Sequence, residues 1–164
     1  MTILFNNAIT FKDIVEIGGG YGNCIRLVNN IINYNNWIII DLPHILEVQE
    51  YFLRNEINDI SKISFIDGTN NNYNFSNKII DLVIGTYSIS ELSWDYFINY
   101  MENVVKYSKY LYLGYNNNCP SPELIKIKLE YILTADFVIQ SKFDYTEPQG
   151  AYVSYTLYKN NNIK

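Results

Sequence analysis

The chain has 164 residues, of which 48% are hydrophobic and 18% charged, and this balance is typical of one globular domain rather than a disordered chain. The 17 Asp and Glu outnumber the 12 Lys and Arg, and the net charge of −5 leads us to exclude nucleic acid as the main partner, because duplex binding needs a basic face. There is no secretion signal and no apolar run of membrane-span length, so we expect a cytoplasmic protein with no membrane partner.

The few cysteine and histidine residues limit redox and metal chemistry. Cys24 and Cys119 are too few for a disulfide framework and form no C-x-x-C pair, and with one histidine in the chain a zinc site is not expected. The abundance of Asn, Ile and Tyr beside scarce Ala and Arg indicates an AT-rich genome.

The first half of the chain alternates short apolar runs with segments of helical period. Strands are predicted at 13–17, 37–40 and 62–66. Between them, helices are predicted at 21–33, with Cys24, Leu27, Val28 and Ile31 on its buried face, and at 44–55 after Pro43.

The second half continues the alternation and ends in a hairpin. A very apolar strand is predicted at 79–86, a helix capped by Ser93, a strand at 110–115 and a helix from Pro122 to about residue 133. Two final strands, 137–143 and 151–158, are joined by a Pro and Gly loop. We therefore expect an α/β fold: a Rossmann-like, doubly wound, mostly parallel seven-stranded sheet with an antiparallel C-terminal hairpin, in a single domain over 1–159 with a polar tail at 160–164.

The glycine-rich junction of the first strand and first helix is the most informative segment. A dinucleotide frame G-x-G-x-x-G fails because Asn23 takes the third glycine's position, and the P-loop Gly-Lys-Ser/Thr is absent. The frame that fits is acidic-x-G-x-G-x-G, formed by Glu16, Gly18, Gly20 and Gly22. It resembles motif I of the class I S-adenosylmethionine-dependent methyltransferases, which implies that these residues bind that cofactor. A tight structural turn is the alternative.

Acidic residues at the ends of the next two strands extend this interpretation. Asp41 ends the second strand, where a carboxylate can accept hydrogen bonds from both ribose hydroxyls, unless it caps the following helix. Asp67 ends the third strand, and the resemblance implies contact with the adenine amino group; a plain Asp-Gly turn is an equal alternative. We also place Leu42, Thr86 and Tyr87 in the cofactor site.

Three segments narrow the resemblance to one family. They are I-D-L-P-H at 40–44, Q-E-Y-F-L at 49–53 and D-L-V-I-G-T-Y-S-I-S-E-L at 81–92. Together they resemble the bacterial sugar O-methyltransferase family. That resemblance implies methyl transfer to a hydroxyl of a sugar or oligosaccharide, and hence a small-molecule or glycan acceptor.

Methyl transfer to an alcohol needs a group that removes the hydroxyl proton. Glu91 is the first candidate base, with a first-turn helix acid as the alternative, and His44 is a weaker candidate. Ser88 and Ser90 are assigned to the acceptor side. Some sugar methyltransferases use magnesium, but Asp41, Asp67 and Glu91 do not have the spacing of a dedicated ligand set, so no metal residue is assigned.

Two other functions stay open. Members of the resembling family have a long N-terminal segment that covers the cofactor, and here only residues 1–12 precede the first strand. The chain is therefore alternatively an inactive, methyltransferase-like binding or assembly module, or a homo-oligomer in which a partner copy supplies the cover. A nucleotide-dependent oxidoreductase is disfavoured by the failed third glycine.

Overall fold

The computed structural model describes residues 11–70, 73, 75–116, 121–148 and 150–163. The strands are β1 (Asp13–Ile17), β2 (Asn36–Asp41), β3 (Ile63–Asp67), β4 (Ile80–Thr86), β5 (Ser108–Asn116), β6 (Phe137–Thr146) and β7 (Tyr152–Asn160). The helices are α2 (Asn23–Val28), α3 (Pro43–Glu56), α4 (Trp94–Asn103) and α5 (Pro122–Thr134), with a short 3₁₀ helix, η1 (Val105–Tyr107), after α4.

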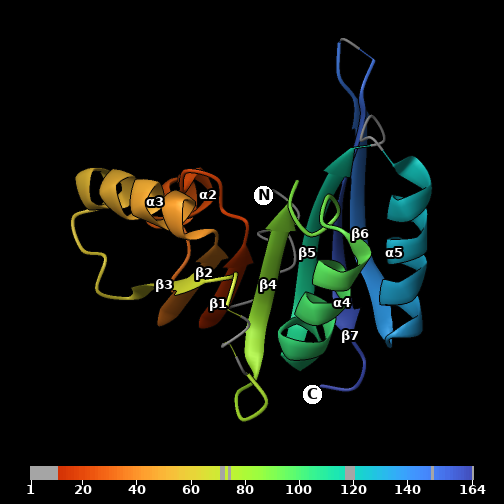
Figure 1. The fold of residues 1–164 in the computed structure, drawn as a ribbon, viewed down its shortest axis with the longest axis horizontal. Coiled ribbons are helices and arrows are strands. Elements are labelled where there is room, and N and C mark those ends of the chain that lie inside the picture. Colours follow the sequence, from red (N-terminus) through yellow and green to blue (C-terminus); the bar gives the residue numbers. More distant parts are fainter. Residues whose placement is uncertain (1–10, 71–72, 74, 117–120, 149, 164) are drawn as a thin grey trace.

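All seven strands form one sheet in the order β3-β2-β1-β4-β5-β7-β6 (Figure 1). The pairs from β3 to β5 are parallel, whereas β7 lies antiparallel between β5 and β6. The predicted fold class is therefore confirmed, including the antiparallel C-terminal hairpin. The strand order reverses beside β1, which has β2 on one side and β4 on the other, and open α/β sheets bind ligands at such a point.

Two apolar cores lie on the two faces of the sheet. Alternate residues of the same strands separate them: Val15 and Val83 belong to the core under α4 and α5, whereas Ile14 and Leu82 belong to the core under α2 and α3. The helices accordingly cover opposite faces and opposite halves of the sheet (Figure 1). The carboxyl ends of the parallel strands all lie at one edge of the sheet, between the two sets of helices.

The first helix differs from its prediction. α2 spans six residues instead of thirteen, and its buried side chains are Ile25 and Val28. Leu27 and Ile31, which we placed on the buried face, are 50% and 63% exposed. The helix ends before Asn29 and Asn30, and because Asn has a low helix propensity the expected period does not continue.

The last strand ends slightly later than predicted. β7 extends to Asn160, whose buried side chain donates a hydrogen bond to the carbonyl of Lys106, 3.2 Å away, so the strand reaches one residue into the segment expected as a tail.

Cys119 lies outside the described residues. Across the part of the chain that the structure describes, no helix has both the length and the apolarity to cross a membrane.

Candidate functional site

The loop between β1 and α2 carries three glycines with left-handed backbone, with φ of 70° at Gly18, 61° at Gly20 and 94° at Gly22. At Gly18, space also requires glycine, because an added Cβ would overlap the Cβ of Ser88. The Gly18 N–H donates to the carbonyl of Ile40, 2.9 Å away. The loop therefore lies closely against the ends of both β2 and β4.

Gln49 of α3 ties this loop to Asp41. Its Nε2 donates to the Gly20 carbonyl at 2.7 Å and to Oδ2 of Asp41 at 2.8 Å, while the Leu42 N–H donates to Oδ1 at 2.8 Å. The Gln49 side chain is fully buried. Sequence analysis missed this role, although a polar residue on the buried side of an otherwise apolar helical face was a usable signal. The result is a carboxylate held in one orientation at the sheet edge.

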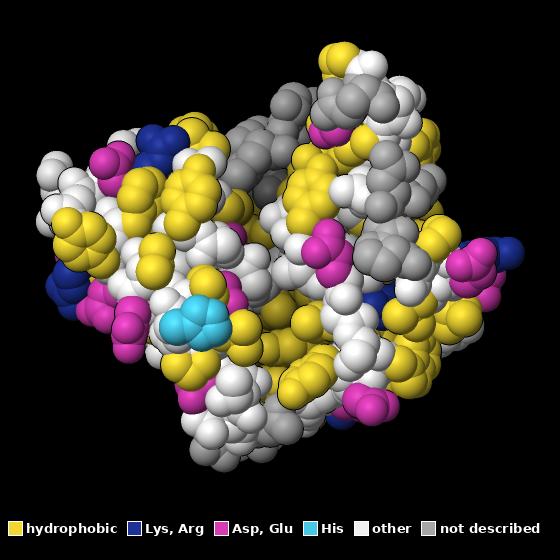
Figure 2. Space-filling model, turned by 45° about the horizontal axis from the view of Figure 1, so that its top comes forward, with side chains coloured by type: hydrophobic (Ala, Val, Ile, Leu, Met, Phe, Trp, Pro, Cys, Tyr) yellow, Lys and Arg dark blue, Asp and Glu magenta, His cyan; other side chains and the backbone are white. Residues whose placement is uncertain are grey.

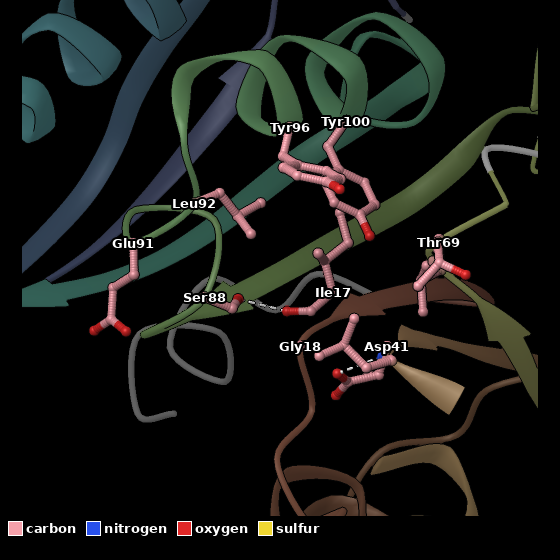
Figure 3. A pocket seen from close by; sticks show the side chains of 12 residues that line it. Ile17, Gly18, Asp41, Thr69, Ser88, Glu91, Leu92, Tyr96 and Tyr100 are labelled. Carbon is pink, nitrogen blue, oxygen red and sulfur yellow. Dashed lines mark hydrogen bonds between the residues drawn. The ribbon is translucent and has the colours of Figure 1, made fainter. Parts of the chain in front are cut away.

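A cleft of about 400 Å³ opens beside Asp41, and we call it the nucleoside cleft. Figure 3 shows Tyr96 and Tyr100 of α4 pointing over Ile17, across from Asp41 and Thr69. Its full lining is Ile17, Gly18, Ile40, Asp41, Leu42, Gly68, Thr69, Ser88, Glu91, Leu92, Tyr96 and Tyr100. An apolar slot with the Asp41 carboxylate at one side is suited to a purine ribonucleoside.

Tyr96 and Tyr100 were missed by the sequence analysis. They stand four residues apart on α4, next to the buried residues Phe97 and Met101. Tyr100 is buried, stacks on Tyr73 with 5.3 Å between ring centroids, and has its pKa raised by burial. Its hydroxyl therefore stays protonated and presents a neutral polar atom to the cleft.

Asp67 forms a compact turn at the end of β3. Its Oδ1 accepts hydrogen bonds from the Thr69 N–H at 2.8 Å and the Thr69 hydroxyl at 2.6 Å, and Asn70 donates to Oδ2. The hydrogen bonds from Thr69 lower the pKa of this carboxyl. Gly68 and Thr69 line the cleft, whereas Asp67 is not among the lining residues. The structure thus shows the Asp-Gly turn, and a contact between Asp67 and adenine stays a prediction.

The segment after β4, residues 88–92, forms the other rim. The Ser88 hydroxyl donates to the Ile17 carbonyl at 2.5 Å, and Glu91 lines the cleft with an exposed side chain that points away from Asp41 (Figure 3). Ser90 is buried, and its hydroxyl has no hydrogen-bond partner among the described residues. Ser88 and Glu91 are thus brought to the site, and Ser90 is not.

A buried lysine of α5 fixes this rim. Lys128 is 1% exposed, and its Nζ donates to the carbonyls of Ser90, at 2.8 Å, and of Leu92, with Ile89 at 3.5 Å. It also lies 5.5 Å from the centre of the Phe97 ring. Burial of an ammonium group is costly without partners, so these carbonyls and Lys128 hold each other in place. Sequence analysis missed Lys128, because nothing in the sequence of α5 distinguishes it from the exposed Lys126.

Glu16 lies behind the glycine loop rather than at its surface. It is 2% exposed, and its Oε2 accepts a hydrogen bond from Nε1 of Trp37 at 3.0 Å. Burial raises its pKa to about 7, against the lowering effect of hydrogen bonds from Trp37 and Cys24. Burial likewise raises the pKa of the Cys24 thiol, although this residue, which we predicted in the core, is only partly buried against the core under α2 and α3.

A second hollow, of about 500 Å³, lies on the other side of Gly18, and we call it the tyrosine hollow. It is lined by Glu16, Gly18, Gly19, Gly20, Asn23, Cys24, Leu27, Thr86, Tyr87, Tyr112 and Tyr155. Thr86 and Tyr87 therefore lie here and not in the nucleoside cleft. Figure 2 shows this end of the molecule hollowed at its centre, with hydrophobic side chains at the floor and rim.

His44 and the acidic residues complete the set of predicted site residues. His44 is exposed in the first turn of α3 and lines neither hollow. Among the described residues, no three His, Cys, Asp or Glu side chains gather in a way that could hold a metal ion. Asp41, Asp67 and Glu91, which we considered together as ligands, therefore do not form one group.

No protein-family model and no curated protein matches the chain, so the resemblance to the sugar O-methyltransferases is not confirmed. Solved structures do match. The methyltransferase domain of bacterial CtHen1 has a TM-score of 0.75 at 11% identity, over 96% of this chain and 95% of that one. TrmK from M. capricolum, solved with S-adenosyl-homocysteine, has a TM-score of 0.68 at 15% identity, over 97% of this chain and 67% of that one. A candidate RNA methyltransferase from Pyrococcus horikoshii has a TM-score of 0.70 at 14% identity, over 99% of this chain and 80% of that one. The fold is that of S-adenosylmethionine-dependent methyltransferases.

One expectation is wrong. We excluded nucleic acid from the net charge, yet a chain of this fold is described as an RNA methyltransferase. Net charge averages over the whole surface and does not describe the site. Unpaired bases are also recognised by stacking on aromatic side chains, which adds no positive charge.

Proposed function

We propose that the chain is an S-adenosylmethionine-dependent methyltransferase. The observation that carries this proposal is the meeting of two hollows at Gly18, the nucleoside cleft on one side and the tyrosine hollow on the other. When bound, S-adenosylmethionine supplies a methyl group on a positively charged sulfur. The methyltransferase fold of the neighbours and the bound S-adenosyl-homocysteine in one of them support the same function.

The residues present fit this cofactor. Asp41 has one hydrogen bond on each carboxylate oxygen and is placed to accept the ribose hydroxyls as well. Tyr96, Tyr100 and Leu92 offer apolar surface for a purine ring. The glycine loop, with Gly18 in both hollows, leaves its backbone accessible to the amino-acid portion.

The acceptor is the finer part of the proposal. We propose Glu91, exposed at the cleft rim, as the base that accepts the proton of an acceptor hydroxyl as the oxygen bonds to the methyl carbon and the carbon–sulfur bond breaks toward sulfur. A hydroxyl acceptor rests on the resemblance of residues 81–92 to sugar O-methyltransferases. This resemblance is the only support for a sugar as the acceptor.

Calorimetry with S-adenosylmethionine and S-adenosyl-homocysteine tests the proposal. We expect saturable binding of one molecule per chain. Asp41→Ala should weaken it by about 1–3 kcal/mol, because the ribose hydroxyls lose the acceptor that this partly buried carboxylate offers. The matched control is Glu130→Ala, which removes the same charge from an exposed position on α5 and should leave the affinity unchanged.

Two results would count against parts of the proposal. Folded protein that binds neither compound excludes the methyltransferase function. Protein that binds both compounds but transfers no labelled methyl group to phenols, glycans or RNA supports the binding-module alternative instead.

A further inference from the structure

Tyrosine rings on three neighbouring strands form a row beside the tyrosine hollow, and two of them, Tyr112 and Tyr155, line it. Tyr112 of β5, Tyr155 of β7 and Tyr145 of β6 follow one another across the hairpin half of the sheet. The Tyr112 and Tyr155 rings are 6.1 Å apart with 13° between their planes, and the Tyr155 and Tyr145 rings are 6.4 Å apart with 7°. We call these three rings the tyrosine floor.

The middle ring lies directly on the backbone of β5. A Cβ added to Gly114 would come within 2.9 Å of Cε1 of Tyr155, so glycine leaves the space that the ring occupies. Because the planes are nearly parallel and the centroids are more than 6 Å apart, the rings are displaced sideways rather than stacked face to face. The three rings therefore form one aromatic row, in which Tyr112 is buried and Tyr155 is partly exposed.

Tyr87 closes one side of the floor at right angles. Its ring meets that of Tyr155 at 89°, and the two hydroxyls are 2.8 Å apart. Tyr87 also has φ of 53°, a conformation that costs free energy for a residue with a large side chain. Its N–H donates to the Gly114 carbonyl at 2.9 Å, which stabilises that conformation. Such strain is concentrated at functional sites.

The chemistry of the hollow selects for one kind of ligand. Its described lining contains no Lys or Arg, and its single acid, Glu16, is buried and hydrogen-bonded to Trp37. An aromatic lining in which the Tyr87 ring stands perpendicular to that of Tyr155 favours a planar ring over a charged or fully saturated group.

On the basis of the proposed function, we propose that the tyrosine floor is the acceptor subsite and that it takes an uncharged planar aromatic ring, either a small phenol or an unpaired nucleobase. Gly18 lines both hollows, so a ring on the floor lies next to the proposed cofactor site. This inference deepens the proposed function and replaces the sugar with a ring-bearing acceptor.

The test is calorimetry on the whole chain, with and without saturating S-adenosyl-homocysteine, using catechol, a uridine hexanucleotide and methyl glucoside as probes. Catechol or the hexanucleotide should bind at least tenfold more tightly than the glucoside. Tyr155→Leu should weaken that binding roughly tenfold, the effect of losing one stacked ring. Gly114→Ala should weaken it as well by displacing the ring, whereas Tyr155→Phe, which keeps the ring, should bind within about threefold of wild type.

Tyr51→Leu is the matched control, because this tyrosine is 75% exposed on α3 and lines neither hollow. Binding of catechol identifies a small phenol and binding of the hexanucleotide an unpaired base; either supports the inference. Tighter binding of the glucoside overturns it, as does Tyr155→Leu or Gly114→Ala protein that is folded and binds a ring probe like wild type. Ring binding without S-adenosyl-homocysteine binding supports the subsite and overturns the proposed function, and the reverse result overturns the subsite alone.

Discussion

The two hollows at the sheet edge are built by different means. On the β2 side, Gln49, Asp41 and the Gly20 carbonyl form a chain of hydrogen bonds that fixes the nucleoside cleft. On the hairpin side, the tyrosine floor is held by ring packing, with one hydroxyl pair between Tyr87 and Tyr155. Directional polar contacts suit one constant ligand, and an aromatic surface tolerates several. The difference fits a site in which the cofactor is fixed and the acceptor varies.

Gly18 joins the two regions, so its replacement should damage both. In Gly18→Ala, the new Cβ overlaps Ser88 and the residue must keep φ of 70°, and we expect about 4 kcal/mol of lost stability together with lost S-adenosyl-homocysteine binding. Urea unfolding and calorimetry measure the two effects. Gly150→Ala is the control, because Gly150 has φ of 88° with open space around it, and it should lose only about 1 kcal/mol. Equal losses in the two variants would show that Ser88 does not press on the glycine loop.

Glu16 lies behind both regions and should make the stability depend on pH. Burial raises its pKa from 4.5 to about 7 in the folded chain, so folded protein binds the proton more tightly than unfolded protein does. Stability from this group is complete below pH 4.5 and is lost as the pH rises through 7, by about 3 kcal/mol in all.

Glu16→Gln isolates this effect, since the amide oxygen still accepts the Trp37 hydrogen bond but does not titrate. Unfolding free energies measured in urea from pH 4 to 8 should diverge, with wild type losing stability relative to the variant as the pH rises. Parallel curves would mean that Glu16 is already ionised in the folded protein near pH 5.

The sequence predicted the parts of the site that depend on local pattern. Strand–glycine–helix order located the loop of Gly18, Gly20 and Gly22, and Asp41 followed from its place at a strand end. Both are local signals, since the ends of parallel strands meet at one edge whatever packs around them. The mostly parallel sheet and the hairpin followed from the same alternation of short strands and helices, whereas the strand order was not predicted.

The rest depends on contacts between distant segments. Lys128 bonds to carbonyls 36 to 39 residues earlier in the chain, and Tyr112 meets Tyr155 only because β7 inserts beside β5. In a chain with 16 tyrosines, no single one is marked as a floor residue. The exclusion of nucleic acid from the net charge was wrong for a related reason, because net charge carries no information about where the charged side chains lie.

Lys128 tests whether the rim at residues 88–92 belongs to the polar region. Lys128→Met keeps the length of the side chain but leaves the Ser90 and Leu92 carbonyls without their donor, and we expect about 2 kcal/mol of lost stability. Affinity for S-adenosyl-homocysteine should fall as Ser88 and Glu91 shift. Lys126→Met, at an exposed position of α5, should change neither quantity. An unchanged affinity in folded Lys128→Met protein would assign Lys128 to stability alone.

Gln49 gives the smallest and most selective effect. Gln49→Met fills nearly the same volume but removes both hydrogen bonds, to the Gly20 carbonyl and to Oδ2 of Asp41. Asp41 then turns more freely, so S-adenosyl-homocysteine should bind about tenfold more weakly, or roughly 1.4 kcal/mol, with a similar loss of stability. Gln140→Met, exposed on β6, controls for the substitution itself. Because Gln49 lies in the β2 half, ring probes should bind the tyrosine floor of this variant as they do in wild type. If cofactor and ring binding fall together, the two hollows are one coupled site, and the contrast between a fixed cofactor half and a tolerant acceptor half does not hold.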